Sequence, residues 1–173
     1  NDELLKMLKK ENKDLLVMHT ASPGSPFSII IADIKDISKE DKEEAAVFTG
    51  CFSQAWKGKA KNVKIHVFNL SDVDKSKVMK SWTWGVKKVK EEISVNLELA
   101  LIKQKDHLRA VPIKTAKKSE ILLRITPGNI EKKDLLPKVA VILDNSFSEA
   151  EILSAFPAGG LSIKNEWFKI SSR

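Results

Sequence analysis

The residues best suited to carry chemistry lie in a short turn between two apolar runs. His19 ends the first run, and Ser22, Gly24 and Ser25 follow it before the second run begins. Pro23 and Gly24 fit the central positions of a type II turn, in which the glycine has φ > 0. An imidazole, two hydroxyls and turn amides could together contact an anion or the polar edge of a ligand. Alternatively, His19 bonds only to a nearby carbonyl and the serines only stabilise the turn.

A second candidate is the lysine-rich segment of residues 57–90. It has a net charge of +8, whereas the whole chain has +7 and everything outside the segment therefore sums to −1. Concentrated positive charge attracts a polyanion, because each contact with a phosphate releases counterions. A solvated lysine-rich surface would have the same composition, so charge alone leaves both interpretations open. The lysines of the segment are Lys57, Lys59, Lys61, Lys64, Lys75, Lys77, Lys80, Lys87, Lys88 and Lys90.

Two tryptophans lie among these lysines. Trp82 and Trp84 are two residues apart, which on an extended chain places them on the same side. Aromatic rings between ammonium groups can stack unpaired bases while the lysines hold phosphates. Either ring could instead fill the core. We expect Trp84, next to Gly85 and Val86, to be buried and Trp82 to be exposed.

The sequence favours binding over catalysis. His19, His66, His107 and Cys51 are far apart, without the close pair spacing of zinc sites. No glycine-rich phosphate loop is present, and Ser25 as a nucleophile would need an acid that orients His19. We therefore expect no catalytic residue, no metal site and no cofactor, and we expect Cys51 to be a small buried hydrophobe.

The composition also predicts a location. No apolar run approaches the roughly 18–20 residues that a membrane span needs, and no basic-then-apolar secretory signal opens the chain. A single cysteine excludes an internal disulfide and suits a reducing compartment. We expect a cytoplasmic protein without membrane contact.

Apolar periodicity predicts an α+β fold: a mixed, mostly antiparallel sheet with one long and one short helix packed on it, then a β-rich C-terminal extension. The long helix begins after Ser38, which can cap it, and runs to about Trp56. The strand at residues 27–32 is apolar throughout, so we expect it to be central. The other expected elements before residue 103 are a helix at 3–10 with Leu4, Leu5 and Leu8 inward, strands at 15–19 and 63–67, a short strand near 71–75, and a hairpin of 84–89 with 92–102.

The extension should also be folded, because it keeps burying apolar residues at regular intervals. We expect domains at residues 1–102 and 103–173, with the role of the second unknown. The elements expected in the extension are strands at 107–113, 120–126, 138–143 and 161–170, a turn at Pro127-Gly128, and a short helix at 148–156.

The turn with its histidine reads His19-Thr20-Ala21-Ser22-Pro23-Gly24-Ser25. It resembles the signature of the NFACT-R domain family, an Asp-hydrophobic-Trp-hydrophobic-His strand followed by a spacer and Pro-Gly-Ser-His-Val. Other segments resemble that family in the same order, which is more specific than one motif. They lie at residues 1–8, 50–57, 61–67 and 75–86, so the resemblance covers roughly residues 1–102. The chain departs from the family at Leu15, Val17 and Pro26, where the family has Asp, Trp and its second His.

The resemblance implies RNA binding in ribosome-associated proteins, without catalysis. Proteins with this domain act on stalled large ribosomal subunits and on tRNA, so we expect rRNA or tRNA and the large ribosomal subunit as partners, in ribosome quality control. The alternatives are an adaptor whose basic segment docks an acidic protein and, more remotely, an enzyme acting on nucleotide ends. The residues expected to bind RNA are His19, Ser22, Gly24, Ser25, Lys57, Lys59, Lys61, Lys64, Lys75, Lys80, Trp82, Lys87 and Lys88.

Overall fold

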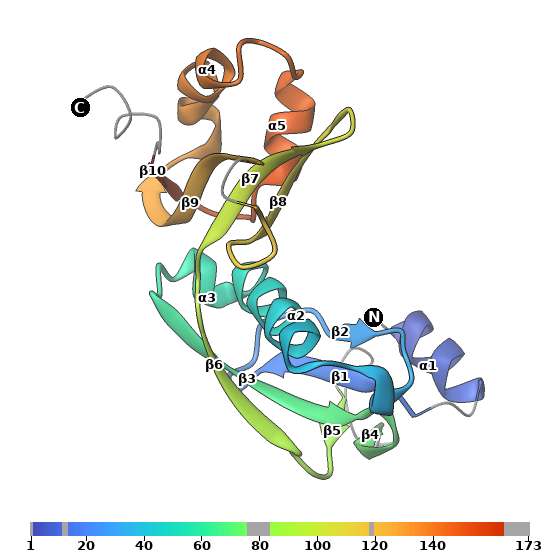
Figure 1. Ribbon diagram of the computed structural model, residues 1–173. Helices are drawn as coiled ribbons and strands as arrows, with labels where there is room; N and C mark the ends of the chain where they lie inside the picture. Colours follow the sequence, from blue (N-terminus) through green and yellow to red (C-terminus); the bar gives the residue numbers. More distant parts are fainter. Residues whose placement is uncertain (1, 12–13, 76–83, 118–119, 165–173) are drawn as a thin grey trace. The chain divides into compact units, whose positions relative to one another are not determined.

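A computed structural model describes residues 2–11, 14–75, 84–117 and 120–164 of the protein (Figure 1). The fold is α+β, as predicted, with helices and antiparallel sheets. Contacts divide the chain into two compact units: a first unit of residues 1–53 and 63–95, and a second unit of residues 54–62 and 96–173. The domain boundary expected at residue 102 stays a prediction.

The first unit is built on a four-stranded sheet in the order β2-β1-β3-β6. Its strands are β1 (Leu16–Thr20), β2 (Ser28–Ile30), β3 (Asn62–Asn69) and β6 (Glu91–Asn96). β1 is antiparallel to both β2 and β3. The strands predicted at residues 15–19 and 63–67 are therefore confirmed.

Alternate residues of β1 pack into two hydrophobic cores on opposite faces of this sheet, because successive side chains of a strand point to opposite faces. Leu16 and Met18 face helix α2 (Lys39–Cys51), which covers one side of the sheet (Figure 1). Val17 faces the other side, where it packs with Phe68 and with helix α1 (Asp2–Lys10). His19 lies two residues after Val17 and therefore on the same second face.

Short elements complete the first unit. A 3-10 turn, η1 (Ile34–Asp36), leads to α2, and a second one, η2 (Leu70–Asp72), follows β3. The two-residue strands β4 (Val73–Asp74) and β5 (Gly85–Val86) pair with each other. The short strand expected near residues 71–75 is thus present.

The second unit has its own four-stranded sheet in the order β10-β9-β7-β8, with every neighbouring pair antiparallel. Its strands are β7 (Leu99–Gln104), β8 (His107–Pro112), β9 (Ile121–Ile130) and β10 (Leu161–Lys164).

Three helices accompany that sheet: α3 (Gln54–Lys57), α4 (Lys132–Ile142) and α5 (Glu149–Ala155). Ser148 and Glu151 form a capping box at the start of α5. The predicted helix at 148–156 and the strands at 107–113 and 120–126 are confirmed, and the last predicted strand begins at residue 161 as expected.

The predicted hairpin of residues 84–89 with 92–102 is wrong. The second arm breaks at Leu97 and Glu98 into β6 and β7, which belong to different sheets, and β5 pairs with β4 instead. In the sequence, apolar residues continue at every second position across the break, from Ile93 and Val95 to Leu97, Leu99 and Leu101, although β7 buries four consecutive residues. A two-residue period therefore cannot reveal a change of sheet.

The predicted long helix is also interrupted. α2 ends at Cys51 and α3 begins at Gln54. Its buried residues are small ones, including Ala46, Gly50 and Cys51, whereas the Phe52 side chain is 41% exposed. Small residues let the helix axis lie close to the sheet.

Four local predictions are corrected. The strand predicted at 138–143 is instead the second half of α4, a helix that contains Pro137. Pro127 and Gly128 lie inside β9, where Pro127 pairs with Leu161 of β10, so they form no turn. β2 is an edge strand rather than a central one, because β1 is its only neighbour among the strands that the structure describes. Leu4 is 42% exposed, although Leu5 and Leu8 are buried as predicted.

Candidate nucleic-acid interface

The turn after β1 is held by its own side chains. The Thr20 N–H donates to Ser25 Oγ at 3.0 Å, and Thr20 Oγ1 donates to the Ser22 carbonyl at 2.6 Å. Gly24 has φ +116°, which confirms the predicted positive φ. Ser22 and Gly24 remain exposed. The serines therefore stabilise the turn, and its outer backbone stays accessible.

The His19 imidazole has one nitrogen engaged and one available. Its Nδ1 lies 2.7 Å from the Thr20 carbonyl oxygen, which only accepts, so Nδ1 carries the proton. Nε2 makes no hydrogen bond to any residue that the structure describes. The carbonyl bond of the structural interpretation is thus present, and it leaves an acceptor free for a ligand.

A ladder of aromatic rings supports His19. The His19 and Phe27 ring centroids are 5.0 Å apart at 43°, and Phe27 meets the buried Phe68 edge-on at 6.1 Å. Both His19 and Phe27 are half-buried. Because one end of the ladder is anchored in the core, the position of the imidazole is fixed.

His66 lies directly opposite His19 in the β1–β3 register. Its Nε2 is 3.3 Å from Glu92 Oε2, while Lys64 Nζ is 2.8 Å from Glu92 Oε1. The Lys64 ammonium lowers the pKa of Glu92, first by hydrogen bonding, and the carboxylate raises the pKa of Lys64. The Ala21 N–H, in the His19 turn, donates to the backbone carbonyl of Lys64 at 2.8 Å. The cluster of Lys64, His66 and Glu92 therefore adjoins the turn.

The lysines predicted as one patch divide between the two units. Lys57, Lys59 and Lys61 belong to the second unit, whereas the other described lysines of the segment belong to the first. By sequence the first unit has 14 lysines and 14 acidic residues, so its formal net charge is zero. The second unit has 16 lysines and arginines against 9 acidic residues, so it holds the whole excess of +7. Lys77, Lys80 and Trp82 lie outside the described residues.

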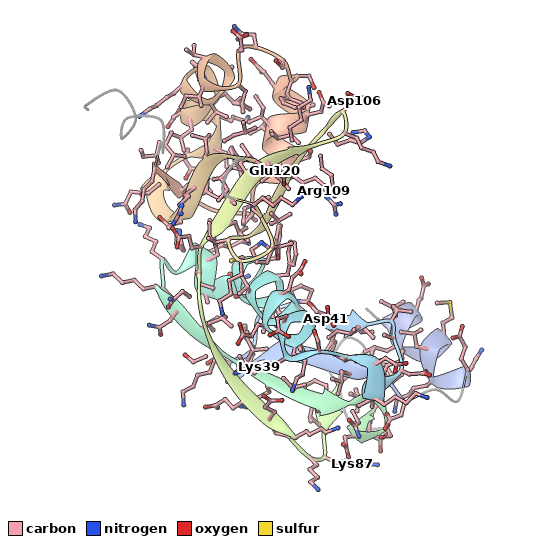
Figure 2. All side chains as sticks on the ribbon, in the orientation of Figure 1. Lys39, Asp41, Lys87, Asp106, Arg109 and Glu120 are labelled. Atoms are coloured by element: carbon pink, nitrogen blue, oxygen red, sulfur yellow. The ribbon has the colours of Figure 1, made fainter. Side chains whose placement is uncertain are left out.

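Some lysines of the first unit already have partners. Lys87 Nζ lies 2.9 Å from Asp74 Oδ2 near the β4–β5 pair, and its hydrogen bond is the largest cause of the lowered pKa of Asp74 (Figure 2). Lys90 Nζ donates to Asn69 Oδ1 at 3.4 Å. Lys88 is exposed and pairs with none of the residues described here.

Trp84 has a structural position. Its half-buried ring packs against the core formed by α1 and β1. The ammonium groups of Lys75 and Lys9 lie 5.2 Å and 5.9 Å from the ring centroid, and Lys9 also donates to the Val73 carbonyl. The ring is therefore occupied by the core and by two cations, and the exposure of Trp82 stays a prediction.

Sequence analysis did not identify three residues of this interface. Phe27 follows the turn directly, so an aromatic residue at the start of the next strand was an available signal. His66 and Glu92 join His19 only through strand pairing, which no local pattern reveals. Within the described residues, no cluster of three or more His, Cys, Asp or Glu side chains could hold a metal ion. No helix described there is long and apolar enough to cross a bilayer.

Two comparisons with known proteins bear on this interface. The family described as NFACT protein RNA binding domain matches residues 1–88. The chain is also similar to the archaeal Rqc2 homolog aRqcH of Methanocaldococcus jannaschii, with 26% identity over 166 residues, which cover 90% of this chain and 25% of that protein. The chain thus spans about a quarter of the length of that curated relative. Since the family match takes in about half of the sequence, the chain belongs to the NFACT RNA-binding domain family.

Proposed function

We propose that the chain binds RNA of the translation machinery and takes part in ribosome quality control. The observation that carries this proposal is the family match over residues 1–88, which includes the His19 turn and most of the lysine segment. The RNA would be rRNA of the large ribosomal subunit or tRNA bound there. The chain would act in the cytoplasm as a binding protein without catalytic activity.

The geometry of the first unit supports contacts with individual nucleotides. His19 offers a free Nε2 acceptor, and the exposed parts of the His19 and Phe27 rings offer a surface on which a base can stack. The exposed amides of the turn and the Lys64 and Lys88 ammonium groups suit phosphates. Because this unit has no net charge, its binding depends on these local groups rather than on a general field.

The assignment to ribosome quality control rests on similarity. The relative is named as an Rqc2 homolog, and its match extends over 90% of this chain, beyond the family match. The chain corresponds to only a quarter of the length of that protein. We therefore propose RNA binding for this chain and no other activity of the whole relative.

Fluorescence anisotropy with a short labelled single-stranded RNA tests the proposal. Affinity should fall with salt, with a logarithmic slope of about 0.7 for each phosphate contact. His19→Gln keeps hydrogen bonding but removes the ring, so it should weaken binding by roughly 1–3 kcal/mol, the value of one stacked base. His19→Phe keeps the ring and should retain most of the affinity.

Two exposed lysines provide a matched pair for this test. Lys88→Glu should weaken RNA binding, whereas Lys39→Glu, at the start of α2, should not (Figure 2). Neither lysine pairs with a described residue, so neither change breaks an ion pair. Absence of any RNA binding, or equal effects of the two changes, would contradict the proposed interface and favour an acidic protein as the partner.

A further inference from the structure

The second unit has a charge distribution unlike that of the first. All of the excess positive charge of the chain belongs to it, and it includes the three arginines as well as Lys57, Lys59 and Lys61. Most of this unit lies beyond residues 1–88, where the family match ends. A unit with 16 basic and 9 acidic residues attracts polyanions whether or not the first unit does.

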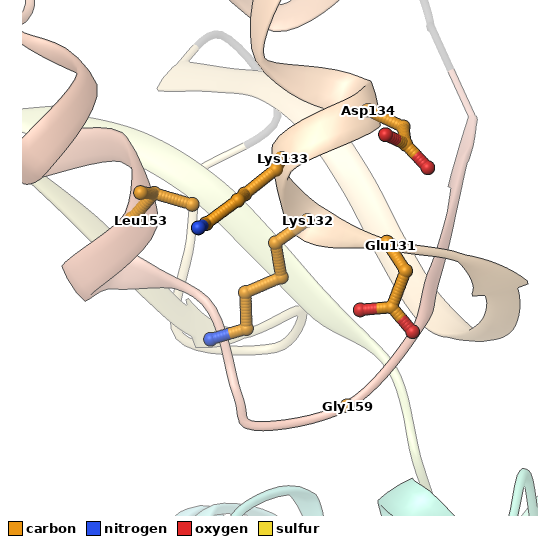
Figure 3. Close-up of a pocket in the computed structure, with 6 residues that line it drawn as sticks. All are labelled: Glu131, Lys132, Lys133, Asp134, Leu153 and Gly159. Atoms are coloured by element: carbon orange, nitrogen blue, oxygen red, sulfur yellow. The ribbon is translucent and has the colours of Figure 1, made fainter.

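Within this unit, Lys57 packs against a loop from a distant part of the sequence. A Cβ placed on Gly159 would lie only 3.1 Å from Lys57 Cγ, so the end of α3 packs against the loop before β10. Gly159 also lines a pocket of about 490 Å³ together with Lys132, Lys133 and Leu153 (Figure 3). Lys57 therefore lies at the edge of a pocket that the first turn of α4 lines with two further lysines.

The ammonium groups in the pocket are placed to hold an anion. Lys132 is half-buried, and its Nζ donates to the Phe156 carbonyl at 2.8 Å, which leaves two of its three N–H donors without a described acceptor. Burial lowers the pKa of Lys132, so an anion beside it would stabilise the charged form. The Lys132 and Lys133 side chains extend toward the Leu153 side of the pocket (Figure 3).

Two carboxylates also line the pocket, and they limit what can bind. Glu131 and Asp134 point to the side opposite the lysine ammonium groups (Figure 3). With Lys57, Lys132 and Lys133 they leave a small positive charge at the pocket. The volume is within the range of roughly 300–1,000 Å³ that is usual for ligand sites, and it accommodates a phosphodiester group together with its sugar.

We propose that this pocket and the adjoining Lys57 bind a backbone phosphate of RNA, so that the second unit makes an RNA contact of its own. The contact recognises phosphate rather than a base, because no aromatic side chain lines the described pocket. It adds a second attachment point to the one proposed at the His19 turn and gives the C-terminal half of the chain a role in the same complex.

The double change Lys132→Gln and Lys133→Gln in the full chain tests this inference. Both ammonium groups are lost, so the logarithmic salt slope for a short single-stranded RNA should fall by about 0.7, the value for one phosphate contact. Lys57→Gln should act in the same direction. Lys138→Gln provides the control, because Lys138 is an exposed lysine of α4 that does not line the pocket. An unchanged slope in the double variant, or an equal loss with Lys138→Gln, would overturn the inference.

A titration of the unaltered chain with inorganic phosphate provides a second readout that needs no variant. Amide resonances of Lys132, Lys133 and Gly159 should shift together with a single saturation curve, and shifts confined to other residues would overturn the inference. The RNA data also separate this site from the proposed function. If only His19→Gln weakens RNA binding, the His19 interface is supported and the pocket is not. If only the pocket variants weaken it, the pocket is supported and the His19 interface is not.

Discussion

The carboxylate of Glu92 lies 2.8 Å from the ammonium group of Lys64, across the pairing of β6 with β3. Lys64 is also the residue whose carbonyl accepts the Ala21 N–H of the His19 turn. An RNA phosphate approaching this turn must compete with Glu92 for Lys64 and for His66. If Lys64 binds RNA as proposed, the local acid should therefore weaken that contact.

Glu92→Gln should strengthen RNA binding by a few-fold, because it frees Lys64 without removing any positive charge. Glu91→Gln is a close control, since Glu91 lies one residue away and pairs with Lys42 instead, at 2.8 Å. Anisotropy titrations at low and moderate salt would measure both. If Glu92→Gln binds RNA no better than Glu91→Gln, Lys64 does not contact the RNA.

Gly24 should be sensitive to any side chain, because its φ of +116° lies in a region that L-residues rarely adopt. Gly24→Val should lower the free energy of unfolding by about 1–3 kcal/mol, the usual cost of such strain. Chemical denaturation would measure the change. Gly58→Ala tests a glycine without positive φ, where the added Cβ meets the Gln54 carbonyl at 3.3 Å. It should cost less, and equal losses would show that the conformation of the turn is not the cause.

Trp84→Ala should mainly reduce stability. The ring packs on the core of the first unit and contacts Lys9 and Lys75, so its removal leaves a partly exposed gap. We expect the free energy of unfolding to fall by about 3 kcal/mol, the lower end of the range for large aromatic residues, because Trp84 is only half-buried. Trp82→Ala should instead weaken RNA binding with little change in melting temperature. Weaker RNA binding of Trp84→Ala at unchanged stability would reverse these roles.

Local sequence patterns were sufficient to predict the features that depend only on nearby residues. The positive φ of Gly24, the strand that contains His19 and the cap at Ser38 each depend on neighbours within a few residues. The change of sheet at Leu97 depends on which strands lie alongside, and alternation is the same on both sides of it. The apolar run at 138–143 belongs to helix α4, because a short apolar run fits a buried helix as well as a strand.

The site shows the same division between local and long-range information. The turn with His19 was visible because a histidine, two serines and a Pro-Gly pair lie within seven residues. His66 and Glu92 reach His19 only through the register of three strands. The distribution of charge between the units was hidden too, because residues 54–62 belong with the C-terminal half rather than with the segments on either side of them.

The two capping boxes should make stability fall in acid. Hydrogen bonds from Ser38 lower the pKa of Asp41 at the start of α2, and those from Ser148 lower the pKa of Glu151 at the start of α5. A carboxyl group with a lowered folded-state pKa binds fewer protons when folded than when unfolded. Its contribution is therefore complete above the unfolded-state value of about 4 and disappears as the pH falls through the folded-state value.

Glu151→Gln should therefore be less stable than the unaltered chain at pH 7, and the difference should shrink toward pH 2. Chemical denaturation across this pH range would measure it. Ser148→Ala removes the other half of the box and should cost about 1 kcal/mol at neutral pH. Glu149→Gln is the matched control, because Glu149 lies in the same first turn but takes no part in the capping box. A pH profile of Glu151→Gln that runs parallel to that of the unaltered chain would show that the Ser148–Glu151 bonds do not stabilise α5.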